Sequence, residues 1–450
     1  MASSHNRIPH RERRSGSPDP GLHVVEGEPK HPLRPVLRSI GLGLISGAAD
    51  DDPSAIGTYA SAGAKFGFAL LWAAPAAFPM MVAVTYLCSK MGQVTGQGLF
   101  EVIRQHYPRW LLYLALFGVV IGNAIEAGAD LGGVAAGVNI FVPIPVPLIV
   151  FGTAILVLGL QILGSYELIR DIFRWLALAL LAYVGSAFLA KPPLLPVIKA
   201  TLIPTIHFNR DFLAILVAMI GTSLSAYLYT WQSNQEVEEE ISMGRQRLED
   251  RRGATEAEIK HAKWDTILGM LFANIIIYFI ILSTAATLYK AGKTDISSAA
   301  EAAQALQPLA GKGAGLLFAL GMIGVGFLAI PVMTTGAAYD LCQTFGWKYG
   351  LHTKPKEAKE FYATIVIVTL VGAAVNFFGI NPIRALVWAG IVQGVSTPPL
   401  MLLIMLITNK RKIMGRWVNS WGMNVLGWVT TAAIFAAALA LLFSLAASRI

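Results

Sequence analysis

The stretch "LISGAADDDPSAIGTY", residues 44–59, carries the three consecutive aspartates Asp50, Asp51 and Asp52 into an otherwise apolar segment. The sequence on both sides has the composition of a chain that crosses a lipid bilayer. An ionisable residue inside such a segment indicates a functional site, because a charge in hydrocarbon is costly unless something compensates it. Pro53 lacks a backbone donor and disfavours helix at the residue before it, so we expect the helix to break at Asp52.

The composition predicts an all-α polytopic membrane protein. The chain has 450 residues, of which 55% are hydrophobic and 14% charged, whereas a soluble protein has about 25% charged residues. Residues 1–35 are polar, Pro-rich and basic without a secretory signal, so we expect a disordered cytoplasmic tail before a transmembrane domain over 36–450. The two cysteines, Cys88 and Cys342, indicate neither a disulfide framework nor a metal cluster. The net charge of +8 lies in short loops, so we expect no nucleic-acid partner.

A criterion of about 20 mostly apolar residues per span predicts about eleven transmembrane helices, near 38–64, 68–90, 110–139, 144–165, 168–190, 211–239, 264–290, 312–343, 360–379, 383–408 and 423–447. With the N-terminus inside, 21 Lys and Arg residues near the spans fall on the inner side and nine on the outer side. The positive-inside rule therefore predicts a cytoplasmic N-terminus and an outer C-terminus, in a plasma membrane of bacterial type. We interpret the charged segment 233–265 as a solvated extension of the sixth span plus a linker, with a cation-attracting inner mouth as the alternative.

Two predicted spans are interrupted at matching positions. The first is broken by "DDDPSA", and the sixth carries the small polar stretch "GTSLSA" at residues 221–226. A pair of broken helices opening two five-helix sets is typical of inverted-repeat secondary transporters, whose substrate lies near midmembrane. We therefore predict one repeat over about 38–190, a second over about 211–408 and an additional helix at 423–447. A cation beside Asp52 would compensate both the carboxylate and the carbonyls that the break exposes.

The sequence resembles the NRAMP family of divalent-metal transporters over nearly its whole length. "DPSA" (52–55) followed by "AGAKFG" (62–67) is similar to the family's first-helix motif Asp-Pro-Gly-Asn with a later Ala-Gly-Ala. "GQVTG" (92–96), "GADLGG" (128–133) and "ITNKRKIMG" (407–415) resemble three further family segments. The resemblance implies a LeuT-type fold of two inverted five-helix repeats with helices 1 and 6 broken.

The resemblance also implies a metal site at the two breaks. The family's binding Asp is Asp52 here, its Asn is Ala55, and the sixth-helix Met, Pro and His stand as Ser225, Ala226 and Tyr227. The carbonyl ligands would come from Ala49 and Thr222. We expect Asp51 in the same cavity and Asp50 along the approach to it. The metal ion is expected as substrate, with no resident cofactor, and the oligomeric state, monomer included, stays open.

The departures from the family pattern favour Mg²⁺. Replacing the Met sulfur by Ser225 removes the soft ligand that selects manganese or iron, and leaves carboxylate, hydroxyl, carbonyl and water oxygens. The small side chains of Ala55 and Ser225 leave room for a partly hydrated ion. This pattern is similar to the NRAMP-related magnesium transporters, although Mn²⁺ also accepts oxygen ligands.

The residues that couple transport to protons in the family are the second point at which this sequence departs from the family pattern. The family's sixth-helix His is Tyr227, whose ordinary pKa near 10 makes it a poor proton shuttle. Asp130 remains, and Glu126 lies one turn earlier on the same helix face. These two carboxylates either form a polar or proton path or are satisfied within the bundle. Resemblance to the magnesium branch implies uncoupled, facilitated transport.

Three alternatives stand beside this hypothesis. One is a proton-coupled importer of Mn²⁺ or Fe²⁺, and another is a sodium-coupled organic-solute carrier of the same fold, which three acidic residues disfavour. The third, a membrane enzyme, is excluded by the lack of a hydrolase or metallopeptidase motif and by eight histidines that all lie outside the predicted spans.

Overall fold

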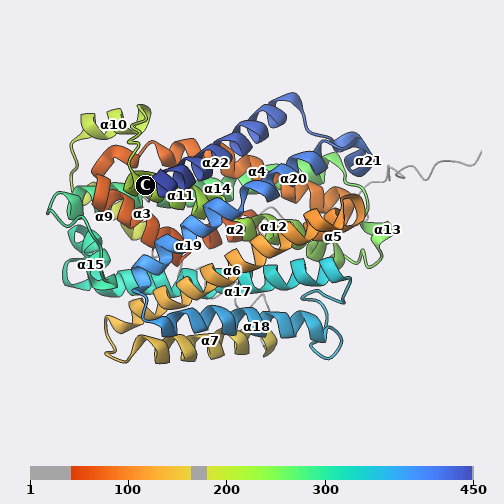
Figure 1. Cartoon of the computed structure of the whole chain (residues 1–450), viewed down its shortest axis with the longest axis horizontal. Helices are drawn as coiled ribbons and strands as arrows, with labels where there is room; N and C mark the ends of the chain where they lie inside the picture. The colour runs from red at the N-terminus through yellow and green to blue at the C-terminus, as the bar shows by residue number, and fades with distance from the viewer. Residues whose placement is uncertain (1–41, 164–179, 448–450) are drawn as a thin grey trace, which may run out of the picture.

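The computed structural model describes residues 42–163 and 180–447, and these residues form helices without a β-strand. The predicted tail, 1–35, and much of the fifth predicted span lie outside the described residues. The helices, labelled in Figure 1, are α2 Leu42–Asp50, α3 Pro53–Phe66, α4 Ala73–Thr95, α5 Leu99–His106, α6 Arg109–Asn139, α7 Val146–Leu163, α9 Leu181–Leu189, α10 Leu194–Leu202, α11 Arg210–Ser223, α12 Ala226–Ser242, α13 Leu248–Arg251, α14 Glu256–Thr284, α15 Ala299–Ala303, α16 Gln307–Ala310, α17 Ala314–Phe345, α18 Lys359–Val375, α19 Pro382–Ser396, α20 Pro398–Thr408, α21 Arg411–Met414 and α22 Trp421–Ala447.

Seven helices of the described chain are long and apolar enough to cross a membrane, and up to nine if each of two bent helix pairs is one span. The first bent pair turns by 112° between α3 and α4, where the first predicted span gives way to the second. The other turns by 43° between α19 and α20. The predicted tenth span is therefore bent, because Pro398 begins α20 and has no N–H to continue the helical ladder.

Two helix ends differ from the predicted span boundaries because of local sequence signals. The second span, expected at 68–90, is α4 and runs to Thr95, because Gly96 adopts the left-handed φ of +63° and ends the helix. The seventh, expected to begin near 264, is α14 and begins at Glu256. Thr255 and Glu258 form a capping box there, each side chain accepting the other residue's backbone N–H.

The long helices form two packed groups. In the first, which we call the bundle, α14 packs along α2, α3 and α4, and α12 packs on α4. In the second, the scaffold, α6 packs against α7, α17 and α18, and Figure 1 shows α7 and α18 on the face opposite α22. Helix α19 contacts α11, α3 and α6, so it touches both groups.

Close helix packing within each group depends on glycine. A Cβ on Gly47 of α2 would overlap the carbonyl oxygen of Gly269 in α14. In the scaffold, a Cβ on Gly128 of α6 would overlap the carbonyl oxygen of Gly372 in α18. The backbones of these helix pairs are therefore in direct contact.

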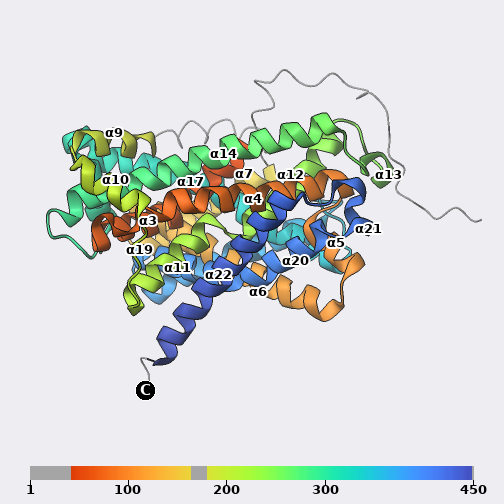
Figure 2. The ribbon, with the colours of Figure 1, turned by 90° about the horizontal axis from the view of Figure 1, so that it is seen from above.

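The short helices mark the two ends of the molecule. Figures 1 and 2 place α9 and α10 at one end, and α5, α13 and α21 at the other, which we call the α13 end. Arg104, Arg251 and Lys412, all predicted to be cytoplasmic, belong to the helices of the α13 end, whereas Lys199 of α10 was predicted to be outside. The predicted grouping of the basic residues is thus consistent with the fold.

The sixth span continues to Ser242 as α12, and part of this extension is not solvated. Glu236 and Glu240 are buried, at 6% and 4% exposure. Glu236 accepts hydrogen bonds from the Ser89 hydroxyl (2.6 Å) and from Gln93 Nε2 (2.8 Å) of α4. The interpretation of segment 233–265 as solvated is therefore wrong at Glu236 and Glu240, and the polar partners of Glu236 come from α4, which local sequence does not reveal.

Candidate functional site

The first helix break lies at the predicted place. Helix α2 ends at Asp50 and α3 begins at Pro53, with Asp52 as the N-cap residue. The Asp52 carboxylate accepts the backbone N–H of Ala55 (2.7 Å) and lies 2.7 Å from the Ser54 hydroxyl. Asp52 thus caps α3 as an aspartate does at many helix starts, but it is fully buried and therefore not in water. The last turn of α2 directs its free carbonyls, with their negative partial charge, toward the same break.

The second break separates α11, which ends at Ser223, from α12, which begins at Ala226. Leu224 and Ser225 leave the helical conformation between them. The Ser225 hydroxyl lies 2.8 Å from the carbonyl oxygen of Gly221 and 3.1 Å from that of Thr222. The hydroxyl therefore satisfies carbonyls that the break frees, at the end of α11 where a positive charge is favoured.

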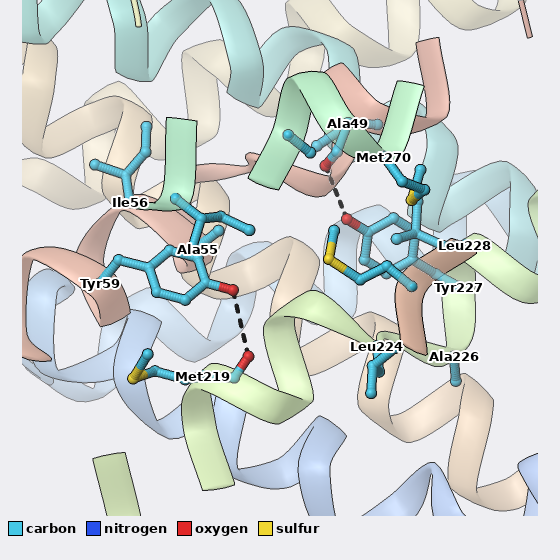
Figure 3. Close-up of a cluster of buried hydrophobic side chains, with 14 of the residues drawn as sticks. Ala49, Ala55, Ile56, Tyr59, Met219, Leu224, Ala226, Tyr227, Leu228 and Met270 are labelled. Carbon is cyan, nitrogen blue, oxygen red and sulfur yellow. Dashed lines mark hydrogen bonds between the residues drawn. The ribbon is translucent and has the colours of Figure 1, made fainter. Parts of the chain in front are cut away.

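Tyr227 connects the two breaks. Its hydroxyl lies 2.8 Å from the carbonyl oxygen of Ala49 and 3.1 Å from Oδ2 of Asp52, and Figure 3 shows the contact with Ala49. Two of the predicted ligand oxygens are thus within reach of a single atom placed between them. Ala55 lies nearby and is fully buried, and its methyl group carries no donor atom for a cation.

Helix α6 brings two more carboxylates to the first break. Asp130 Oδ1 accepts the backbone N–H of Ser54 (3.0 Å), and Glu126 Oε1 lies 3.1 Å from the Ser54 hydroxyl. Glu126 Oε1 also lies 3.5 Å from the Ser225 hydroxyl, and its Oε2 accepts a hydrogen bond from Gln393 Nε2 of α19 (2.5 Å). Glu126 therefore touches both breaks and α19.

We call Asp52, Ser54, Glu126, Asp130, Ser225 and Gln393 the carboxylate network. All six side chains are fully buried, and the hydrogen bonds of the network join the bundle to the scaffold. The side chains from the two breaks contribute only oxygen atoms. Such donors suit a hard cation such as Mg²⁺, Ca²⁺ or Mn²⁺. The hydroxyls of Ser54 and Tyr227 lie 2.7 Å and 3.1 Å from the Asp52 carboxylate.

Asp50 and Asp51 are fully buried as well. None of their four carboxylate oxygens has a hydrogen-bond partner among the described residues. No group of three or more His, Cys, Asp or Glu side chains in the described chain is arranged to hold a metal ion. Any cation at the breaks would therefore depend on carbonyl and hydroxyl oxygens as well as carboxylates.

The structure brings most of the sequence-predicted residues together. Asp52, Ala49, Ser225 and Tyr227 meet at the breaks, and Glu126 and Asp130 share one face of α6, as the four-residue spacing predicted. One feature was missed. Ser54 links three carboxylates, and its place after Pro53 in the motif was the available signal. Gln393 of α19 reaches Glu126, whereas the hydroxyl of Ser396 lies 3.4 Å from the carbonyl oxygen of Gln393.

Comparisons with known proteins identify the family of this chain. The family model described as Natural resistance-associated macrophage protein-like (Nramp) matches residues 43–444. A divalent metal cation transporter MntH of Klebsiella pneumoniae (strain 342) is 26% identical over 429 residues, covering 91% of this chain and 95% of the relative. A second MntH, of Klebsiella pneumoniae subsp. pneumoniae, has the same identity and coverage.

Solved structures share the fold at low identity. The manganese transporter of Eremococcus coleocola, in complex with an aromatic bis-isothiourea substituted compound, matches with a TM-score of 0.72 at 16% identity, over 94% of this chain and 89% of that one. Mhp1, a nucleobase-cation-symport-1 family transporter in a closed conformation, matches with a TM-score of 0.54 at 15% identity, over 91% and 92%. The predicted LeuT-type architecture is therefore confirmed. This chain belongs to the Nramp family, whose members are metal-ion transporters, and it is a membrane transporter rather than an enzyme.

Proposed function

We propose that this protein carries divalent metal cations across the membrane by alternating access, with Mg²⁺ as the preferred substrate and Mn²⁺ as a second one. The observation that carries the proposal is the position of Ser225 at the second break, 3.5 Å from Glu126 and 3.1 Å from the carbonyl oxygen of Thr222. The donors that converge there are oxygens, which suit hard divalent cations. The names of the Klebsiella relatives support the substrate class.

The ligands we propose are the Asp52 carboxylate, the Ala49 and Thr222 carbonyls and the Ser225 hydroxyl, with Asp51 close by. Ala55 would contribute space rather than a donor atom. Mg²⁺ loses its waters reluctantly, so we infer that the ion keeps several of them. The network must then open for loading, since its side chains have no exposed surface in this structure.

We also propose that transport is not coupled to protons. Tyr227 occupies the position where a proton-carrying His is expected. Its hydroxyl is hydrogen-bonded to the carbonyl oxygen of Ala49 and to Asp52. One oxygen of Glu126 and one oxygen of Asp130 are hydrogen-bonded to Ser54. A membrane potential of 100 mV drives a doubly charged ion with about 4.6 kcal/mol, twice about 2.3. The gradient and the potential therefore suffice.

A second candidate is a proton-coupled Mn²⁺ or Fe²⁺ importer. The contact between Asp130 and the backbone N–H of Ser54, two residues after Asp52, favours it. The two candidates differ in one measurable quantity, the movement of protons with the metal.

The test uses purified protein in liposomes that contain dyes for Mg²⁺, Mn²⁺ and pH. We expect uptake of both metals by the wild type, no metal-dependent change of internal pH, and no uptake by Asp52→Ala. Asp211→Asn, which removes an exposed carboxylate paired with Lys65, is the matched control and should transport normally. Wild-type uptake by Asp52→Ala would falsify the site, and acidification that follows metal entry would favour the second candidate.

We propose a cytoplasmic N-terminus and α13 end, and an outer C-terminus. The test exploits the burial of both native cysteines, Cys88 and Cys342. An impermeant thiol reagent applied to whole cells should label Lys199→Cys in α10 and spare Lys260→Cys near the start of α14. The reverse labelling pattern would invert the topology.

A further inference from the structure

Asp340 of α17 is a buried carboxylate that the proposed site does not use. Its side chain has 0% exposure, and neither carboxylate oxygen has a hydrogen-bond partner among the described residues. An ionised carboxylate without well-formed hydrogen bonds in a membrane-protein interior is costly unless a proton or a cation neutralises it. Asp340 therefore requires an explanation beyond packing.

The position of Asp340 relates it to the second helix break. Helix α17 belongs to the scaffold and packs against α12, the half-helix that follows the break. Gly336, one turn before Asp340, packs against α12, where a Cβ on it would lie 3.5 Å from Oγ1 of Thr230 and 4.0 Å from the carbonyl oxygen of Tyr227. Asp340 thus lies about one helical turn beyond the point where α17 meets the backbone of Tyr227, toward the α13 end.

The oxygens next to Asp340 resemble the donors of the main site. The Thr230 hydroxyl is a polar neighbour of Asp340, and it donates to the carbonyl oxygen of Tyr227 (3.1 Å). The hydroxyl of the same tyrosine reaches Asp52. One residue, Tyr227, therefore touches Asp52 with its side chain and the surroundings of Asp340 with its backbone.

Polar side chains continue from Thr230 to the α13 end. Asn234 Nδ2 donates to the carbonyl oxygen of Thr230 (2.8 Å), and Gln343 Nε2 donates to Asn234 Oδ1 (2.6 Å). Gln343 Oε1 accepts the backbone N–H of Glu101 in the first turn of α5 (3.3 Å). The row joins the interface between α12 and α17 to a short helix at the end of the molecule.

We propose that Asp340 is a second cation station on the route between the carboxylate network and the α13 end. The proposal rests on the proposed function, since it assigns the path of the same divalent cation. The station offers the Asp340 carboxylate, the Thr230 hydroxyl and the Tyr227 carbonyl. One carboxylate with neutral oxygens holds a hydrated Mg²⁺ or Mn²⁺ weakly, as suits an ion in transit.

The kinetic test is Mn²⁺ uptake into liposomes by Asp340→Asn. We expect the maximal rate to fall at least about tenfold while the half-saturating Mn²⁺ concentration stays within about twofold, because loading at Asp52 is untouched. Asp340→Glu keeps the charge and should retain at least about a third of the wild-type rate. It also keeps the test decisive if Asp340→Asn folds poorly. A wild-type rate in Asp340→Asn, or a rate in Asp340→Glu as low as in Asp340→Asn, would overturn the station.

The binding test counts bound Mn²⁺ by electron paramagnetic resonance at millimolar Mn²⁺. We expect Asp52→Ala to retain one bound ion and the double variant Asp52→Ala/Asp340→Asn to lose it, a difference that a purely structural role of Asp340 would not produce. Equal counts in the two variants would overturn the station even if uptake were slow. If the wild type moves neither Mn²⁺ nor Mg²⁺, the proposed function itself fails, which is a different result from a wild type that transports beside an unaffected Asp340→Asn.

Discussion

The hydroxyl of Tyr227 lies 3.1 Å from Oδ2 of Asp52, the carboxylate at the first helix break. A cation that binds Asp52 and the Ala49 carbonyl must compete with this hydroxyl for both oxygens. Removing it by Tyr227→Phe should therefore tighten binding. The loss of one buried hydrogen bond, worth about 1 kcal/mol, predicts a half-saturating Mg²⁺ concentration lower by about two- to tenfold in liposome uptake.

Tyr183→Phe is the control for Tyr227→Phe, because it removes a buried hydroxyl from α9 that has no hydrogen-bond partner among the described residues. It should leave the half-saturating concentration unchanged. Weaker Mg²⁺ binding by Tyr227→Phe would mean that the hydroxyl is itself a ligand.

Ser225→Met tests the origin of selectivity. A thioether at the second break adds a soft ligand, which Mn²⁺ and Cd²⁺ accept more readily than Mg²⁺. We expect the uptake ratio of Mn²⁺ to Mg²⁺ to rise by about tenfold, a change of about 1.4 kcal/mol. Ser396→Met, on α19 outside the network, should leave the ratio as it is. An unchanged ratio in Ser225→Met would show that this side chain does not face the ion.

The contact between His352 and Glu238, which we call the latch, predicts that transport depends on pH. His352 Nδ1 lies 2.8 Å from Glu238 Oε2, and Tyr339 and the backbone N–H of Leu351 donate to Glu238 Oε1. The hydrogen bond with Glu238 raises the pKa of His352, opposed by its partial burial and by Arg251. The latch that holds α12 to the segment after α17 is thus fully formed below the ordinary pKa of 6.5, and it weakens as the pH rises through the raised pKa.

Metal uptake into liposomes, measured from acid to alkaline pH, tests whether the contact between His352 and Glu238 affects transport. Because the His352 side chain is 39% exposed, the strength of the pair is at most about 1 kcal/mol. We expect the turnover rate to rise by up to about fivefold across the transition, and His352→Gln to flatten the profile. His261→Gln changes an exposed histidine on α14 and should behave as the wild type does. A pH profile that survives in His352→Gln would assign it to another group.

Gly128→Ala tests the contact between α6 and α18. The added Cβ would overlap the carbonyl oxygen of Gly372, and overpacking of this kind costs about 1–3 kcal/mol. We expect a lower melting temperature and less protein in detergent extracts, measured by fluorescence-detected size exclusion. Gly159→Ala in α7 has no atom within 4 Å of the new Cβ and should be neutral. Equal stability of the two variants would refute the close contact.

Much of the fold could be predicted because its signals are local. Asp52 followed by Pro53 breaks a helix wherever it stands, and the spacing of Glu126 and Asp130 places both carboxylates on one face. The burial of Glu236 could not be predicted, because its partners come from α4, far away in sequence. The same reason applies to the site. Nothing near Ser54 in the chain indicates that it meets α6, and only the packing of the two groups brings them together.

The glycine contacts described for the fold have a mechanical consequence. Inside the bundle, Gly47 meets Gly269 backbone to backbone, and inside the scaffold Gly128 meets Gly372 in the same way. Between the two groups, the contacts at the site include hydrogen bonds to side chains, such as the one from the Ser54 backbone to Asp130. Close steric contacts between backbones have no substitute when two helices move apart, whereas water or an ion can replace the partner of a hydrogen bond. We infer that the molecule is stiffer within the bundle and within the scaffold than at the contact between them, which is where we propose that the cargo binds.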